Sequence, residues 1–131
     1  MTPYGLALIY AALAALPLAM HIALVFGAPL GRFTLGGRYS GRPTPLRRWA
    51  AMAQGLLLLG MATTVLDFGG VLALDLPDAL FWGTFALSCV TALLNVISPS
   101  RPERLLWGPV TGLMALSAGA LIFLIKTGGV L

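Results

Sequence analysis

Four long apolar stretches alternate with short polar ones along this chain. They cover approximately residues 4–26, 45–68, 77–97 and 101–126. In each stretch apolar residues occupy every face of a helix instead of a single stripe, which is typical of helices surrounded by lipid. At 1.5 Å per residue, each stretch is long enough to cross a hydrocarbon core of about 30 Å. The pattern predicts an all-α fold, in which residues 1–131 form one membrane domain built as an antiparallel bundle of four transmembrane helices.

Local signals indicate where these helices begin and bend. Thr44, followed by a proline, is expected to cap the second helix, and Asp75 is expected to cap the third. Ser100 and Glu103 have the spacing of a capping box at the start of the fourth helix. Pro17 lies in the middle of the first stretch, where it removes a backbone donor and crowds the preceding turn. We therefore expect a kink at Pro17.

The charged residues support a membrane location and indicate an orientation. Only 9% of the residues are charged, whereas soluble domains average about 25%. The net charge of +4 could suggest nucleic acid, but seven of the eight basic residues lie in two short segments, 32–48 and 101–104. Short basic loops beside apolar spans mark a cytoplasmic face. We expect a multi-pass protein of a bacterial inner membrane, with both termini on the periplasmic side and no nucleic-acid partner.

Small residues recur at steps of four in the first and fourth stretches. In lipid, such faces let helix backbones approach closely. We expect this helix-packing face to work within the bundle, or to contact a second copy or another membrane protein. Its members are Ala7, Ala11, Ala15, Ala19, Ala23, Gly108 and Gly112.

Polar residues follow one side of the third stretch, at Thr84, Ser88, Thr91 and Asn95. A polar row on a lipid-embedded helix is expected to point inward. Because threonine and serine can bond to carbonyls of their own helix, the row could be a structural seam between helices. The alternative is a wetted groove or a path for a ligand.

His21, Gln54 and Asn95 are expected at a similar depth, with Glu103 and Arg104 just outside the membrane. Polar groups at such depths are costly and call for a functional hypothesis. His21 could be a hydrogen-bonded structural residue, a proton carrier or a cofactor ligand. It is the single histidine, so a haem held by two histidines would need a second subunit. We expect no cofactor and no metal ion.

The connection over residues 27–44 is rich in glycine and arginine. Gly36 and Gly37 allow tight turns, and Arg32, Arg38 and Arg42 supply fork-shaped donors. Backbone amides and guanidinium groups together suit a phosphate, and anionic lipid headgroups are the phosphates found at a membrane surface. The segment lacks the Lys-Ser/Thr ending of a nucleotide-binding loop. It is therefore either a headgroup site or an ordinary basic loop.

Two segments carry a resemblance to a known group of proteins. They are residues 27–31, GAPLG, with the later Gly36-Gly37 pair, and residues 95–109, NVISPSRPERLLWGP. Both resemble features of small four-helix integral membrane proteins of bacteria, over most of the chain. The resemblance implies the four-helix architecture and adds no catalytic residue.

Three functions remain open from the sequence. The favoured one is a small inner-membrane bundle that acts by packing, as a homo-oligomer or as an accessory subunit of a larger membrane complex. The first alternative is binding or transport of an anionic amphiphile with a phospholipid-like headgroup. The second is an intramembrane enzyme that uses His21 and Glu103. A single ionisable group at membrane depth favours a protein that is not an enzyme.

Overall fold

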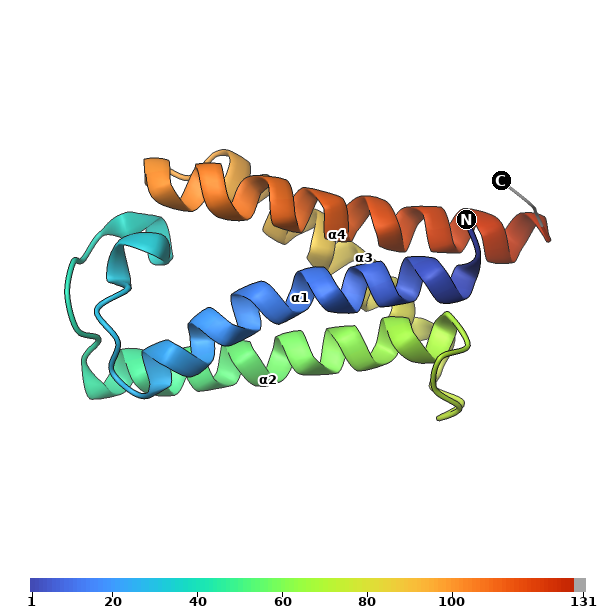
Figure 1. Ribbon diagram of the computed structural model, residues 1–131, viewed down its shortest axis with the longest axis horizontal. Helices are drawn as coiled ribbons and strands as arrows, with labels where there is room; N and C mark the ends of the chain where they lie inside the picture. The colour runs from blue at the N-terminus through green and yellow to red at the C-terminus, as the bar shows by residue number, and fades with distance from the viewer. Residues whose placement is uncertain (129–131) are drawn as a thin grey trace.

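The chain folds into a bundle of four long helices (Figure 1). The computed structural model describes residues 1–128. Each of the long helices is long and apolar enough to span a membrane, so the predicted all-helical fold with four such helices is confirmed. Every boundary of a long helix lies within one residue of the predicted one. In chain order the helices are α1 (Pro3–Val25), the short 3-10 helices η1 (Gly31–Phe33) and η2 (Leu35–Gly37), α2 (Pro45–Phe68), α3 (Asp78–Val96) and α4 (Arg101–Thr127).

Two of the three predicted helix caps are present. The Thr44 hydroxyl oxygen accepts a hydrogen bond from the Arg47 amide at the start of α2, at 3.4 Å. The Ser100 hydroxyl oxygen accepts one from the Glu103 amide at the start of α4, at 3.3 Å. Each cap supplies an acceptor to a helix amide that has no partner within its helix. Only half of the predicted capping box forms, because the Glu103 carboxylate binds other donors.

The prediction that Asp75 caps α3 is wrong. The residue at the N-cap position is Pro77, which makes no side-chain cap, and Asp75 adopts a left-handed backbone with φ of 54°. The carboxylate that organises this connection is Asp67, near the end of α2. It accepts hydrogen bonds from the amides of Leu74, at 2.6 Å, and Leu76, at 3.0 Å. Asp67 therefore fixes the path of the chain between α2 and α3.

One hydrophobic cluster joins all four helices near the end of the bundle where α1 begins. Tyr10 from α1, Val65 from α2, Phe81 from α3 and Leu121 from α4 are all buried in it. The Phe81 ring stacks on Phe68, with 4.6 Å between the ring centroids. α1 packs closely on both α2 and α4, and α3 packs on α4, whereas α2 and α3 contact each other much less. The bundle therefore has three close helix pairs and one loose pair.

The segment between α1 and α2 covers the opposite end of the bundle. Residues 26–44 fold back over the start of α4 (Figure 1, left). We call this end the loop end. α1 continues through Pro17 as a single helix, and Figure 1 shows it changing direction along its length.

Candidate functional site

A cavity of about 880 Å³ lies inside the half of the bundle nearest the loop end. Its apolar wall includes Leu57, Leu58 and Met61 from α2, and Leu87 and Leu94 from α3. Most of its polar groups lie toward the loop end, with Ser88 and Thr91 deeper along α3. They come from all four long helices, from residues 34–39 and from the connection between α3 and α4. The polar lining residues are His21, Thr34, Arg38, Tyr39, Arg47, Gln54, Ser88, Thr91, Asn95, Ser98, Glu103 and Thr111.

The polar row of α3 lies on the inner side of that helix. Ser88 is buried; its hydroxyl donates to the Thr84 carbonyl at 2.8 Å and accepts from the Tyr10 hydroxyl at 2.8 Å. Asn95 donates from its amide nitrogen to the Thr111 hydroxyl at 3.2 Å. Thr91 lies between these two points, half-buried, and lines the cavity. The row thus joins α3 to α1 and α4 and also supplies polar atoms to the cavity wall.

His21 is held from both ring nitrogens. Its Nδ1 lies 2.7 Å from the Pro17 carbonyl oxygen, to which it must donate. Its Nε2 lies 2.7 Å from Oε1 of Gln54 on α2. Nε2 either donates to this oxygen or, with the Gln54 amide turned over, accepts from the NH₂ group in the same place. His21 therefore links α1 to α2 through two hydrogen bonds.

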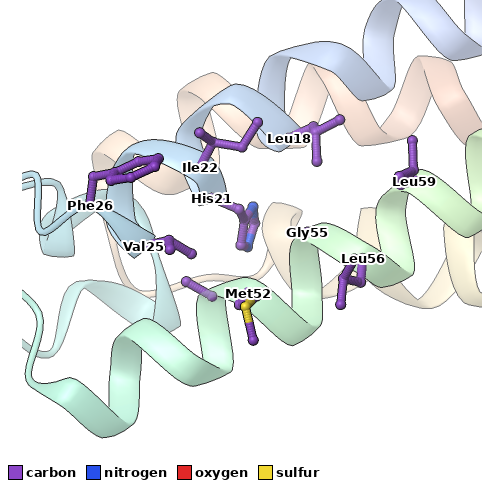
Figure 2. Close-up of a pocket in the computed structure, with 10 residues that line it drawn as sticks. Leu18, His21, Ile22, Val25, Phe26, Met52, Gly55, Leu56 and Leu59 are labelled. Carbon is purple, nitrogen blue, oxygen red and sulfur yellow. The ribbon is translucent and has the colours of Figure 1, made fainter.

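A second, smaller cavity lies on the outer side of the same helix pair. It has a volume of about 280 Å³ and is apolar apart from His21. Figure 2 shows His21 pointing from α1 toward α2 beside Gly55. A Cβ at Gly55 would lie 3.5 Å from that of His21, so the glycine allows the two helices to approach closely. Of the described residues, His21 alone lines both cavities.

The loop end is closed by hydrogen bonds between residues 32–36 and the start of α4. Oε2 of Glu103 accepts from the Gly36 amide at 2.8 Å and from the Ser98 hydroxyl at 2.6 Å. The Ser100 hydroxyl donates to the Arg32 carbonyl at 2.8 Å. The indole of Trp107 donates to the Phe33 carbonyl at 2.9 Å. These contacts hold residues 32–36 over the polar end of the cavity.

Glycine is required at two places in this segment. Gly37 has φ of 66°, and a Cβ there would lie 2.9 Å from the Ser100 Cβ. A Cβ at Gly31 would overlap the Tyr39 ring. Gly36 also has a positive φ, of 71°, and its amide is used by Glu103. The predicted headgroup glycines Gly36 and Gly37 therefore lie against α4, and the amide of Gly36 is already bonded.

The three arginines predicted to bind a headgroup are placed differently. Arg38 lines the large cavity, whereas Arg32 and Arg42 do not. Within residues 1–128, the Arg38 side chain makes no hydrogen bond or ion pair. Arg47, at the start of α2, also lines the cavity, and its guanidinium lies 3.6 Å from the centre of the Tyr39 ring. Sequence reasoning missed Arg47, because only the folding of residues 26–44 brings Arg38 and Arg47 to the wall of one cavity.

Arg104, predicted to lie at the rim beside Glu103, does not pair with that carboxylate. Its guanidinium donates instead to the Ser98 carbonyl at 2.8 Å. Glu103 is only 9% exposed, and both of the hydrogen bonds that its carboxylate accepts are made by Oε2. Glu103 therefore has no cationic partner among the described residues.

The small residues that recur every four positions in α1 do not all lie on one side of the helix. Steps of four residues advance the position by roughly 40° beyond a full turn at each step. Ala7 is fully buried, Ala11 and Ala23 are half-buried, and Ala15 and Ala19 are exposed. On α4, Gly108 is buried and Gly112 is half-buried. The first alanine thus belongs to the core, while Ala15 and Ala19 are available on the surface.

In comparisons with protein-family models, curated proteins and solved structures, nothing matches this chain.

Proposed function

We propose that the protein binds an amphiphile whose headgroup carries a phosphate-like anion. The observation that carries this proposal is the division of the large cavity into two parts. Its apolar wall lies along α2 and α3, and most of its polar groups, with all of the charged ones, lie toward the loop end. A membrane amphiphile has the same two parts in the same relative positions. Arg38 and Arg47, which line the polar part, are the anion-binding groups, since guanidinium forks match phosphate oxygens.

The loose contact between α2 and α3 is the route for the hydrocarbon chain. Three apolar residues that line the cavity are also largely exposed: Leu57 is 52% exposed, Leu94 is 58% exposed and Ile97 is 63% exposed. Exposure of this extent in the cavity wall supports an opening between α2 and α3. A chain lying there stays in an apolar environment along its length, so it loses no hydrophobic free energy on leaving the bilayer.

The proposal includes a location and an orientation. In it the four helices form an antiparallel bundle in a bacterial inner membrane, with the loop end in the cytoplasm and both termini in the periplasm. The support is the charge distribution, since seven of the eight basic residues belong to segments 32–48 and 101–104 at the loop end. Labelling an introduced cysteine at Arg38 and another at Asp75 in intact cells tests this, because the two positions must react from opposite sides.

The binding proposal is tested with two arginine pairs of equal charge. The double variant Arg38→Gln/Arg47→Gln removes the guanidinium groups that line the cavity. The control Arg32→Gln/Arg42→Gln removes the same charge from outside it. Native mass spectrometry of purified protein measures the bound phospholipid. We expect the first pair to lower binding at least tenfold, because each lost charge-assisted bond is worth about 1.5–3 kcal/mol. Equal effects of the two pairs would refute the proposal.

A second candidate function is association through the exposed part of α1. Ala15 and Ala19 are exposed, and small residues on a lipid-facing helix allow a second helix to approach. This supports the expected role as a homo-oligomer or accessory subunit. Ala15→Leu should then lower the oligomeric state on a native gel, with Leu16→Ala as the control on a neighbouring exposed position. An unchanged oligomeric state in Ala15→Leu would count against this candidate.

The intramembrane-enzyme alternative has less support. His21 and Glu103 line the same cavity, but each is engaged in other contacts. Both ring nitrogens of His21 are occupied, by Pro17 and Gln54, so the ring has no free lone pair with which to act as a general base.

A further inference from the structure

Glu103 contributes a buried carboxylate without a cationic partner among the described residues to the polar end of the cavity. Carboxylates are rarely buried without a cation nearby, because removing the charge from water is costly. Glu103 is 9% exposed, lines the cavity and has no cationic partner within residues 1–128. The nearest arginine in sequence, Arg104, donates to a carbonyl instead.

The two oxygens of this carboxylate have different surroundings. Oε2 accepts from the Gly36 amide and from the Ser98 hydroxyl. Oε1 has no hydrogen-bond partner among the described residues. Every fully buried polar side-chain atom of these residues has such a partner, so Oε1 is accessible. Glu103 is also one of the residues that line the cavity.

Glu103 lines the same cavity as the proposed anion-binding groups, Arg38 and Arg47. Its carboxylate accepts from the Gly36 amide at 2.8 Å, and Arg38 is two residues further along the chain. A wholly anionic headgroup bound by the two arginines would therefore share the cavity with a like charge.

We propose that Oε1 of Glu103 binds an ammonium group, so that the preferred ligand is an amphiphile with a zwitterionic head, a phosphate next to an ammonium. This inference rests on the proposed function, which assigns the phosphate site, and adds a site for the ammonium group. Arg38 and Arg47 bind the phosphate, and Glu103 selects among heads that carry one. Binding supplies the cation that the buried carboxylate lacks.

The test compares two lipids that differ in the ammonium group. The full chain in detergent is mixed with equal amounts of a phosphoethanolamine lipid and a phosphoglycerol lipid with identical acyl chains, and native mass spectrometry measures both complexes. One arm of the experiment uses single-chain lipids and the other uses two-chain lipids. The comparison shows whether the headgroup is bound as part of a single-chain or a two-chain amphiphile. We expect the phosphoethanolamine lipid to be preferred roughly tenfold, from one charge-assisted hydrogen bond.

Two variants assign this preference. Glu103→Gln keeps an oxygen acceptor for Gly36 and Ser98 but removes the charge, and should abolish the preference. Ser98→Ala removes a hydrogen bond of the closed loop but keeps the carboxylate, and should retain the preference. Equal binding of the two lipids by the unaltered protein, or a preference that survives Glu103→Gln, would overturn this inference.

The outcomes also separate this inference from the proposed function. If both lipids bind equally and Arg38→Gln/Arg47→Gln weakens both, the anion site stands and the ammonium site is refuted. If neither lipid binds the unaltered protein, both proposals are refuted.

Discussion

The indole of Trp107, one turn and a half into α4, donates a hydrogen bond of 2.9 Å to the Phe33 carbonyl in the segment between α1 and α2. It joins residues 74 positions apart in the chain. Together with the bonds from Ser100 and Glu103, it fixes the segment over the cavity. The closed loop end therefore depends on side chains from the first turns of α4.

Removing the Trp107 donor should loosen this segment. Trp107→Phe keeps an aromatic ring but loses the hydrogen bond, which is worth about 1 kcal/mol. Opening should become roughly fivefold more frequent. The rate of trypsin cleavage after Arg38 or Arg42 in detergent measures it. Trp49→Phe, at an exposed tryptophan, is the control, and equal cleavage of the two variants would contradict the role assigned to Trp107.

Alanine substitutions at two glycines with positive φ can distinguish the cost of backbone strain from the cost of a close contact. Gly37 has φ of 66° with the Ser100 Cβ 2.9 Å from an added Cβ, whereas Gly41 has φ of 96° with nothing within 4 Å. Alanine at either position bears the cost of a left-handed backbone, about 1–2 kcal/mol. Gly37→Ala should lose a further 1–3 kcal/mol, roughly, from overpacking. Unfolding midpoints in denaturing detergent report the difference, and equal losses would argue against close packing at Gly37.

The bond between His21 and Gln54 should stabilise the pairing of α1 with α2. Gln54→Leu leaves Nε2 of a buried imidazole without a partner, at a cost of about 1–3 kcal/mol. The midpoint of unfolding should fall accordingly. Thr63→Val is the matched control on α2, since the Thr63 hydroxyl bonds only to its own helix, at the Leu59 carbonyl. A midpoint that falls no further in Gln54→Leu than in the control would show that the bond contributes nothing.

Asp67 should control the order of the connection between α2 and α3. Its two carboxylate oxygens accept from Leu74 and Leu76 separately. Asp67→Asn leaves one acceptor oxygen, so one of these amides loses its partner. Hydrogen–deuterium exchange should become faster over residues 72–76. Asp78→Asn removes the same charge from the start of α3, and it should leave exchange in that segment unchanged.

The helices could be predicted because their signals are local. An unbroken apolar run sets the length of each span, and Thr44 and Ser100 cap helices through residues only three positions away. The prediction for Asp75 was wrong because it also used only local sequence. Asp75 has the position of a cap before α3, but the amide of Leu74 is bonded to Asp67, seven residues earlier in the chain. A contact of that kind has no fixed spacing in the sequence.

The cavity could be predicted only in part. The inward position of the polar row of α3 follows from helical periodicity, and His21, Gln54 and Asn95, which are expected at a similar depth, all line the cavity. That Arg38 and Arg47 both line the cavity depends on how residues 26–44 fold, and no periodic pattern encodes that. The sequence predicts that Gly36 and Gly37 help to bind a headgroup, and the structure adds that they lie close to Pro99 and Ser100 at the start of α4.

The unequal packing of the four helices leaves one side of the bundle weaker than the others. α1 and α4 pack on each other, and each also packs against one further helix, α2 or α3. Separating α2 from α3 would therefore break fewer contacts than separating any other neighbouring pair, so a ligand that entered the cavity there would disturb the bundle least.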